Sequence, residues 1–94
     1  TQDGVVTSAW KTAMFIDGNK AQLARDAASG QGETLDALAA LLKVEAADKA
    51  AFVSLAKARH ADIFTSVESA DSIATRLKAA LQSDARLAKY AEAV

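Results

Sequence analysis

The sequence has no cysteine, no proline, only four glycines and few aromatic residues in its 94 positions. The lack of cysteine excludes disulfide scaffolds, thiolate-ligated zinc, iron–sulfur clusters and thiol catalysis. It leaves the redox compartment open, because proteins of oxidising compartments can also lack disulfides. Without proline, the ends of secondary structure elements must be set by glycine and by capping side chains.

An excess of one charge is also missing, as are long apolar runs. The 11 basic and 12 acidic side chains give a formal net charge of −1. No basic excess is available to neutralise a phosphate backbone, so no nucleic-acid partner is expected. No apolar run approaches the roughly 20 residues that cross a bilayer, so no membrane span is expected.

Alanine is the residue that is abundant, at 24 of the 94 positions. It has the highest helix propensity, and β-branched residues are few, so the sequence predicts an all-α fold. The expected architecture is a compact single domain over residues 1–94, an orthogonal or bundle-like array of four to six short helices. Residues 1–6 are expected to form a flexible lead. Since alanine buries little surface, stability must come from close approach of the helices.

Apolar residues at three- and four-residue spacings mark the expected helices. They predict helices over about residues 7–28, 33–43, 47–64 and 70–82, a turn over 65–69, and a short last helix capped by Ser83 and Asp84. Within the first of these, Asp17, Gly18 and Asn19 interrupt the pattern. One kinked helix and two short helices, the second capped by Asn19, are both compatible with the sequence.

Local chemistry predicts several helix ends. Gly30 is placed to be a left-handed C-cap, because it lacks a Cβ. Lys43 is expected in the last turn of its helix, where a cation suits the helix dipole. Ser69 is a good N-cap for the helix that follows it.

The segment from Gly30 to Thr34 is a glycine-containing loop that opens a helix, a geometry that can receive phosphate. It lacks the Gly-Lys-Ser/Thr of a phosphate-binding loop, and Glu33 places negative charge where an anion would dock. The favoured interpretation is a tight turn between helices, pinned by an ion pair between Arg25 and Glu33.

His60 is the single histidine and lies at the margin of an apolar helix face. With Met14 it could supply axial ligands to a noncovalent haem, but a packing or surface role is favoured. No metal and no cofactor is expected. An enzyme would need Asp26, Glu33 and His60 to converge in one cleft. The sequence contains no complete catalytic constellation, so the protein is not expected to be an enzyme.

A longer pattern runs through the chain, carried by Asn19, Leu23, Arg25-Asp26-x-Ala28-x-Gly30-x-Gly32-Glu33-x-Leu35-x-x-Leu38-Ala39-x-Leu41-Leu42, then Phe52, Ile63-Phe64-Thr65-Ser66 and Asp84-x-x-Leu87-Ala88-x-Tyr90. With this pattern, over about residues 15–92, the chain resembles the bacterial domain-of-unknown-function family 3015. Precursors in that family typically carry a signal peptide, so the resemblance implies a periplasmic or secreted protein. The start at Thr1 fits a mature form of this kind, and equally a trimmed chain. The family has no assigned activity.

Two functions remain compatible with the sequence. The first is a non-enzymatic interaction module of the cell envelope that contacts a protein partner or itself. It is favoured by the near-neutral charge and the alanine-rich helices. The second is a carrier that holds a small apolar ligand or haem between helices. The residues that could face such a ligand, whose identity is unknown, are Trp10, Met14, Phe52, His60 and Phe64.

Overall fold

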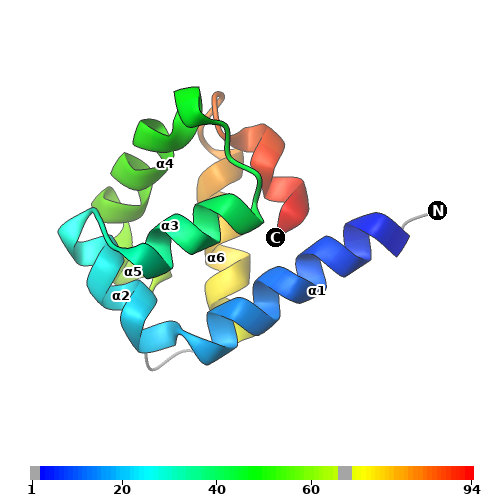
Figure 1. The fold of residues 1–94 in the computed structure, drawn as a ribbon, viewed down its shortest axis with the longest axis horizontal. Coiled ribbons are helices and arrows are strands. Elements are labelled where there is room, and N and C mark those ends of the chain that lie inside the picture. The colour runs from blue at the N-terminus through cyan, green and yellow to red at the C-terminus, as the bar shows by residue number, and fades with distance from the viewer. Residues whose placement is uncertain (1–2, 66–68) are drawn as a thin grey trace.

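The protein is built from helices alone in the part of the chain that its computed structural model describes, residues 3–65 and 69–94 (Figure 1). The elements are α1 (Asp3–Gly18), α2 (Lys20–Ser29), α3 (Glu33–Leu41), α4 (Ala46–Ala58), α5 (His60–Ile63), α6 (Ala70–Gln82) and the 3₁₀ helix η1 (Ala88–Ala93). The all-α prediction is confirmed, but these seven elements exceed the four to six expected.

The predicted lead and the predicted turn overlap only partly with the described residues. Helix α1 begins at Asp3, so residues 3–6 of the expected lead are helical, and residues 1–2 lie outside the described residues. Residues 66–68 of the turn expected over 65–69 also lie outside them.

Asn19 separates α1 from α2, which settles the alternative over residues 7–28 in favour of two helices. Its role differs from the expected N-cap, because its side chain makes no hydrogen bond to the start of α2. Instead, Asn19 Nδ2 donates to the carbonyl oxygen of Phe15 at 2.8 Å. The side chain thereby satisfies one of the carbonyls that a helix leaves unpaired at its end.

The helix expected over residues 47–64 is interrupted at Arg59, whose backbone dihedral angles are φ −117° and ψ 20°. His60 Nδ1 donates to the carbonyl oxygen of Lys57 at 2.8 Å and so pairs with the end of α4. This second break raises the number of helices, because α5 follows as a separate single turn.

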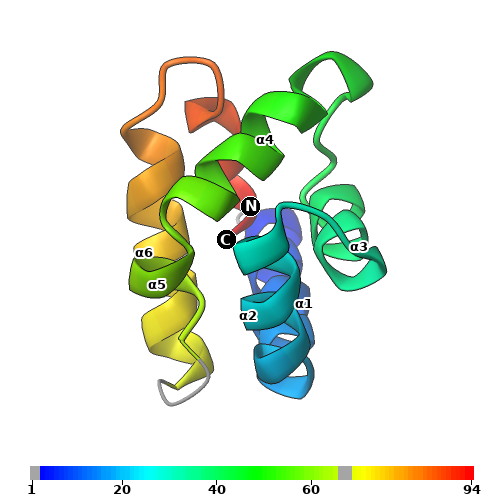
Figure 2. The same ribbon diagram turned by 90° about the vertical axis from the view of Figure 1, so that its left-hand side faces the viewer.

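The helices enclose one continuous apolar cluster. Helix α1 packs mainly against α6 and η1 and also contacts α2 and α3. Helix α2 contacts α3, α4 and α5, and Figure 2 shows it in front of α1 with α4 crossing above. Each of the helices α1–α6 contributes fully buried side chains, among them Ile16, Leu23, Leu35, Phe52, Ile63 and Leu77. Leu87, just before η1, is also fully buried, and η1 adds Tyr90 and Ala91 to the cluster. The Thr12 hydroxyl donates to the Ala93 carbonyl oxygen at 2.8 Å and ties α1 to the C-terminal segment. The radius of gyration is 11.8 Å.

Helix α6 has the bounds that the apolar spacing predicts. The Ser69 side chain accepts a hydrogen bond from the Ser72 amide at 3.1 Å, so the predicted N-cap is confirmed. After α6, Asp84 Oδ1 accepts from the amide of Arg86 at 2.9 Å and starts the turns that lead into η1.

Lys43 is not in the last turn of α3, which ends two residues earlier at Leu41. Its φ is +62°, a left-handed conformation that is costly for a side-chain-bearing residue. The amide of Lys43 donates to Ala40 and that of Val44 to Ala39, both at 3.0 Å. This is the Schellman ending in which glycine is the preferred residue.

Replacing Lys43 with glycine is therefore expected to raise the free energy of unfolding by about 1 kcal/mol, because glycine adopts this conformation without strain. Urea denaturation followed by circular dichroism measures the change. The matched control is Ala50→Gly on the exposed side of α4, which is expected to lower stability by about 1 kcal/mol. A Lys43→Gly variant that is less stable than the parent would contradict the assignment of Lys43 to the left-handed position of a Schellman ending.

Candidate functional site

The turn between α2 and α3 is the best-marked part of the sequence pattern. Gly30 has φ +76° and ψ 24°, so the predicted left-handed C-cap is confirmed. Its amide donates to the carbonyl oxygens of Asp26 and Ala27, and the amide of Gln31 donates to Asp26 at 3.1 Å. Helix α2 thus ends in a Schellman motif that requires a residue without steric cost at φ > 0.

Asp26 holds this turn together from the preceding helix. Its Oδ2 accepts hydrogen bonds from the amides of Thr34 at 3.0 Å and Leu35 at 3.2 Å, and so caps α3. The N-cap position itself is Gly32, which has no side chain to do so. The amides that a phosphate would need are therefore bonded to the chain's own carboxylate.

The expected ion pair between Arg25 and Glu33 does not form in the described part of the chain. The turn is pinned by Asp26, the neighbour of Arg25, through backbone amides. A carboxylate at a helix N-terminus satisfies orphan N–H groups and complements the helix dipole, which an exposed side-chain pair cannot do.

The five residues considered for an apolar ligand lie in three different places. Phe52 and Phe64 are buried in the core, at 0% and 2% exposure. His60 lies at the junction of α4 and α5 and is bonded to a backbone carbonyl. Trp10 and Met14 lie on α1 and are 58% and 56% exposed. Only these last two share a surface.

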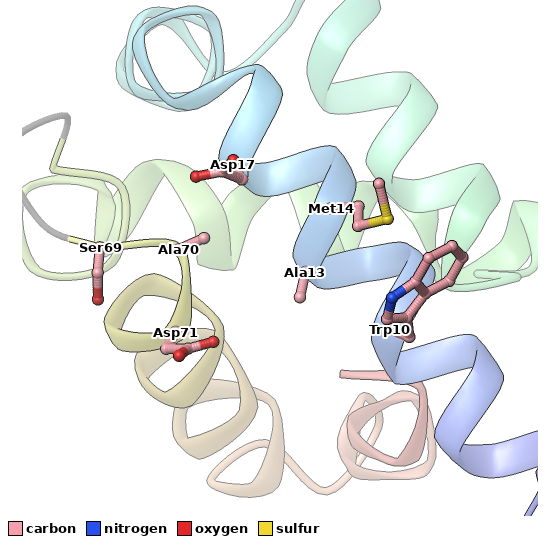
Figure 3. Close-up of a pocket in the computed structure, with 7 residues that line it drawn as sticks. All are labelled: Trp10, Ala13, Met14, Asp17, Ser69, Ala70 and Asp71. Carbon is pink, nitrogen blue, oxygen red and sulfur yellow. The ribbon is translucent and has the colours of Figure 1, made fainter.

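That surface is a shallow groove of about 360 Å³ between α1 and the beginning of α6 (Figure 3). Its lining residues are Trp10, Ala13, Met14, Asp17, Ser69, Ala70 and Asp71. A second hollow of about 320 Å³ continues it along α6, and it shares Ala13 and Asp71 while adding Lys78 and Val94. We call the first of these hollows the α1–α6 groove.

The helical repeat explains why α1 presents this face. Thr12 and Ile16 are fully buried, so the side chains of Trp10 and Met14, on the opposite side of the helix, point outward. Trp10 and Met14 are four residues apart and therefore neighbours on the helix surface. Figure 3 shows Ala13 and Asp17 on the side of α1 that faces α6, with Trp10 and Met14 at the outer edge.

Two carboxylates give the groove its charge. Asp17 comes from the last turn of α1 and Asp71 from the first turn of α6. Neither has an ion-pair partner within residues 10–65 and 69–94. The helix dipole favours Asp71 in its place, but it disfavours a carboxylate at the C-terminal end of α1. The groove therefore offers an apolar rim beside two unneutralised negative charges.

A second polar cluster centres on Asp48, a carboxylate only 6% exposed. The Tyr90 hydroxyl donates to Asp48 Oδ2 at 2.5 Å and accepts from the Glu45 amide at 3.1 Å. Arg86 Nε lies 3.2 Å from Oδ1, and Lys89 Nζ lies 3.4 Å from Oδ2. This cluster fastens η1 to the beginning of α4, and sequence reasoning missed it because no local signal links these residues.

The hydrogen bond from Tyr90 holds the pKa of Asp48 below its usual 3.8, against burial, which raises it; Lys89 and Arg86 lower it further. The Asp48 carboxylate in turn raises the pKa of Lys89 above 10.5. A lowered acid pKa stabilises the fold above about pH 4, and this contribution is lost as the pH falls through the folded-state pKa. The contribution of Lys89 is lost only as the pH rises above 10.5.

We therefore expect the free energy of unfolding to fall below about pH 4, and we expect Asp48→Asn to flatten this fall. Urea midpoints measured at pH 7 and at about pH 3 test it. Asp62→Asn, at an exposed carboxylate of α5, is the matched control and should keep the acid dependence of the parent. If the free energy of unfolding fell equally at low pH in the parent and in Asp48→Asn, the Asp48 cluster would not be the source of the acid dependence.

Other kinds of site find no support in the described ranges. They contain no group of three or more histidine, aspartate or glutamate residues placed to hold a metal ion. None of their helices combines the length and the hydropathy of a membrane span.

Comparison with known proteins agrees with the resemblance seen in the sequence. No curated protein and no solved structure matches the chain. One family model, described as a protein of unknown function, matches residues 1–91, which include the first 14 residues as well as the turn centred on Asp26. The chain belongs to this family, the proteins of unknown function DUF3015.

Proposed function

We propose that this chain is a non-enzymatic interaction module of the cell envelope that binds a protein partner through the α1–α6 groove. The observation that carries the proposal is the exposure of Trp10 and Met14, at 58% and 56%, side by side at the rim of the groove. Large apolar side chains exposed together are costly on a monomer, and Trp and Met are enriched where proteins meet.

The proposal that this module is not an enzyme rests on the contacts that its acidic and histidine side chains already make within the chain. Asp26 is occupied as the cap of α3. Asp48 is bonded to Tyr90 and to two cations. His60 uses Nδ1 to pair with a backbone carbonyl. A catalytic acid or base must instead be able to reach a substrate proton.

The envelope location is part of the proposal and rests on the resemblance to a family whose precursors typically carry a signal peptide. Fractionation of source cells that produce the tagged precursor is expected to place the protein in the periplasm or the medium. Recovery in the cytoplasm alone would count against it.

The alternative is a carrier of a small apolar ligand. It is supported by the volume of the groove, about 360 Å³, which falls within the range of ligand pockets. His60 and Met14 do not support haem binding as a pair of axial ligands, because His60 is not among the residues that line the groove with Met14. Native mass spectrometry of protein purified from its source separates the two, since a carrier retains added small-molecule mass.

Site-specific photo-crosslinking in source cells tests the partner directly. A photo-reactive residue at position 14 is expected to give a discrete adduct with another polypeptide, whereas one at position 50, exposed on α4, is expected to give none. Peptide mass spectrometry identifies the partner. No adduct from position 14, or the same adducts from both positions, would overturn the proposal.

A further inference from the structure

We infer that the partner supplies a basic amphipathic segment, with an apolar side chain against Trp10 and Met14 and lysine or arginine side chains on Asp17 and Asp71. This inference rests on the proposed function, because it names the chemistry of the partner at the same groove. Two features of the groove support this inference, its shape and its charge.

The shape of the groove favours one apolar anchor. Ala13 and Ala70 lie between the larger groups and fill little space, so the groove is hollow where they stand. Trp10 and Met14 border this hollow, and the thioether of methionine adapts to irregular apolar surfaces. A leucine-sized side chain entering there would remove apolar surface of both residues from water.

The charge of the groove selects a cation. Asp17 and Asp71 have no ion-pair partner among the described residues. Asp17 also stands at the negative end of the α1 dipole, where a carboxylate lowers helix stability. A lysine or arginine from a partner would neutralise both groups, and the face of the Trp10 ring also attracts cations.

The position of Lys78 restricts where the basic residues of the partner segment can lie. Asp71 also borders the adjoining hollow, which Lys78 lines, so the basic residues of the partner should lie beside Asp17 and Asp71 and away from Lys78. A second copy of this chain fits less well. Docked face to face, it would add a second Asp17 and a second Asp71 to the interface and no basic residue of the groove lining, since a two-fold interface uses the same surface twice.

Trp10 is the single tryptophan of the chain, so its fluorescence reports on the groove alone. The probes are two synthetic amphipathic peptides of equal length without tryptophan, one of leucine and lysine and one of leucine and glutamate at the same positions. Titration of the leucine–lysine peptide is expected to give a saturable blue shift of the Trp10 emission. The leucine–glutamate peptide is expected to bind at least about tenfold more weakly, because like charges meet across the interface.

The variant Asp17→Asn/Asp71→Asn tests the charged contacts. We expect it to raise the Kd for the leucine–lysine peptide about fivefold to tenfold, the effect of losing two partly exposed ion pairs. The matched control, Glu33→Gln/Glu45→Gln, removes the same formal charge at two exposed residues outside the groove lining. It is expected to leave the Kd unchanged.

Each other outcome overturns the inference in a distinguishable way. Equal binding of both peptides, or equal loss in both double variants, would remove the charge selection and leave an apolar docking groove. A blue shift that grows with protein concentration alone, together with a dimer in sedimentation, would make a second copy the occupant. No response of Trp10 to either peptide would reject the basic segment, while crosslinking at position 14 still decides whether a partner binds.

Discussion

Replacing Gly32 with alanine is expected to lower the free energy of unfolding by about 3–4 kcal/mol, a large part of the stability of a domain this small. Gly32 has φ +138°, which side-chain-bearing residues rarely adopt. A Cβ at this position would also overlap the carboxylate carbon and both oxygens of Asp26. The variant therefore combines backbone strain with loss of the Asp26 cap on α3.

Urea denaturation measures the effect, and Gly18→Ala is the matched control. A Cβ at Gly18 would meet nothing within 4 Å, so that change is expected to be neutral or slightly stabilising. Asp26→Ala should cost about 1–2 kcal/mol by itself. The double variant Asp26→Ala/Gly32→Ala should cost less than the sum of the single changes, because the overlap is gone. Strict additivity would show that the two residues do not act together.

Replacing Phe52 with alanine is expected to cost about 3–5 kcal/mol, the usual effect of emptying a phenylalanine site in a core. Phe52 lies on α4 and is 0% exposed, and it belongs to the continuous apolar cluster. The prediction separates two interpretations of this residue. A core side chain stabilises the protein by itself, whereas a residue that lines an empty ligand site would contribute much less.

Met14→Ala is the control for Phe52→Ala, because Met14 is a large apolar residue that is 56% exposed. It is expected to change stability by less than about 0.5 kcal/mol. A small apolar solute such as benzene should restore part of the stability lost in Phe52→Ala by entering the cavity, and should not affect Met14→Ala. A near-neutral Phe52→Ala variant would return Phe52 to the candidates for ligand contact.

Helix ends with a local chemical cause could be predicted from the sequence. The N-cap at Ser69 and the left-handed Gly30 depend on residues within one turn of each other. The breaks at Asn19 and Arg59 were harder to predict. Asn19 acts on the preceding helix and not on the following one. Arg59 interrupts an apolar pattern that is continuous in the sequence.

The candidate site depends on which helices meet. Asp17 and Asp71 stand far apart in the chain and share a groove only because α1 packs against α6. Asp48 and Tyr90 are joined in the same way, through the packing of η1 near the beginning of α4. No spacing rule connects such pairs, since an apolar stripe shows which face of a helix is buried and not which helix covers it.

The sequence by itself determined the helical class, the apolar faces of α3 and α6, the family, and the turn at Gly30, because these follow from residues close together along the chain. The tertiary structure alone decided that Asp26 caps α3, that Phe52 and Phe64 belong to the core, and that Trp10 and Met14 stay exposed beside α6. These outcomes depend on how whole helices dock. The sum of many weak side-chain contacts sets that docking, and a pattern read along one helix does not contain it.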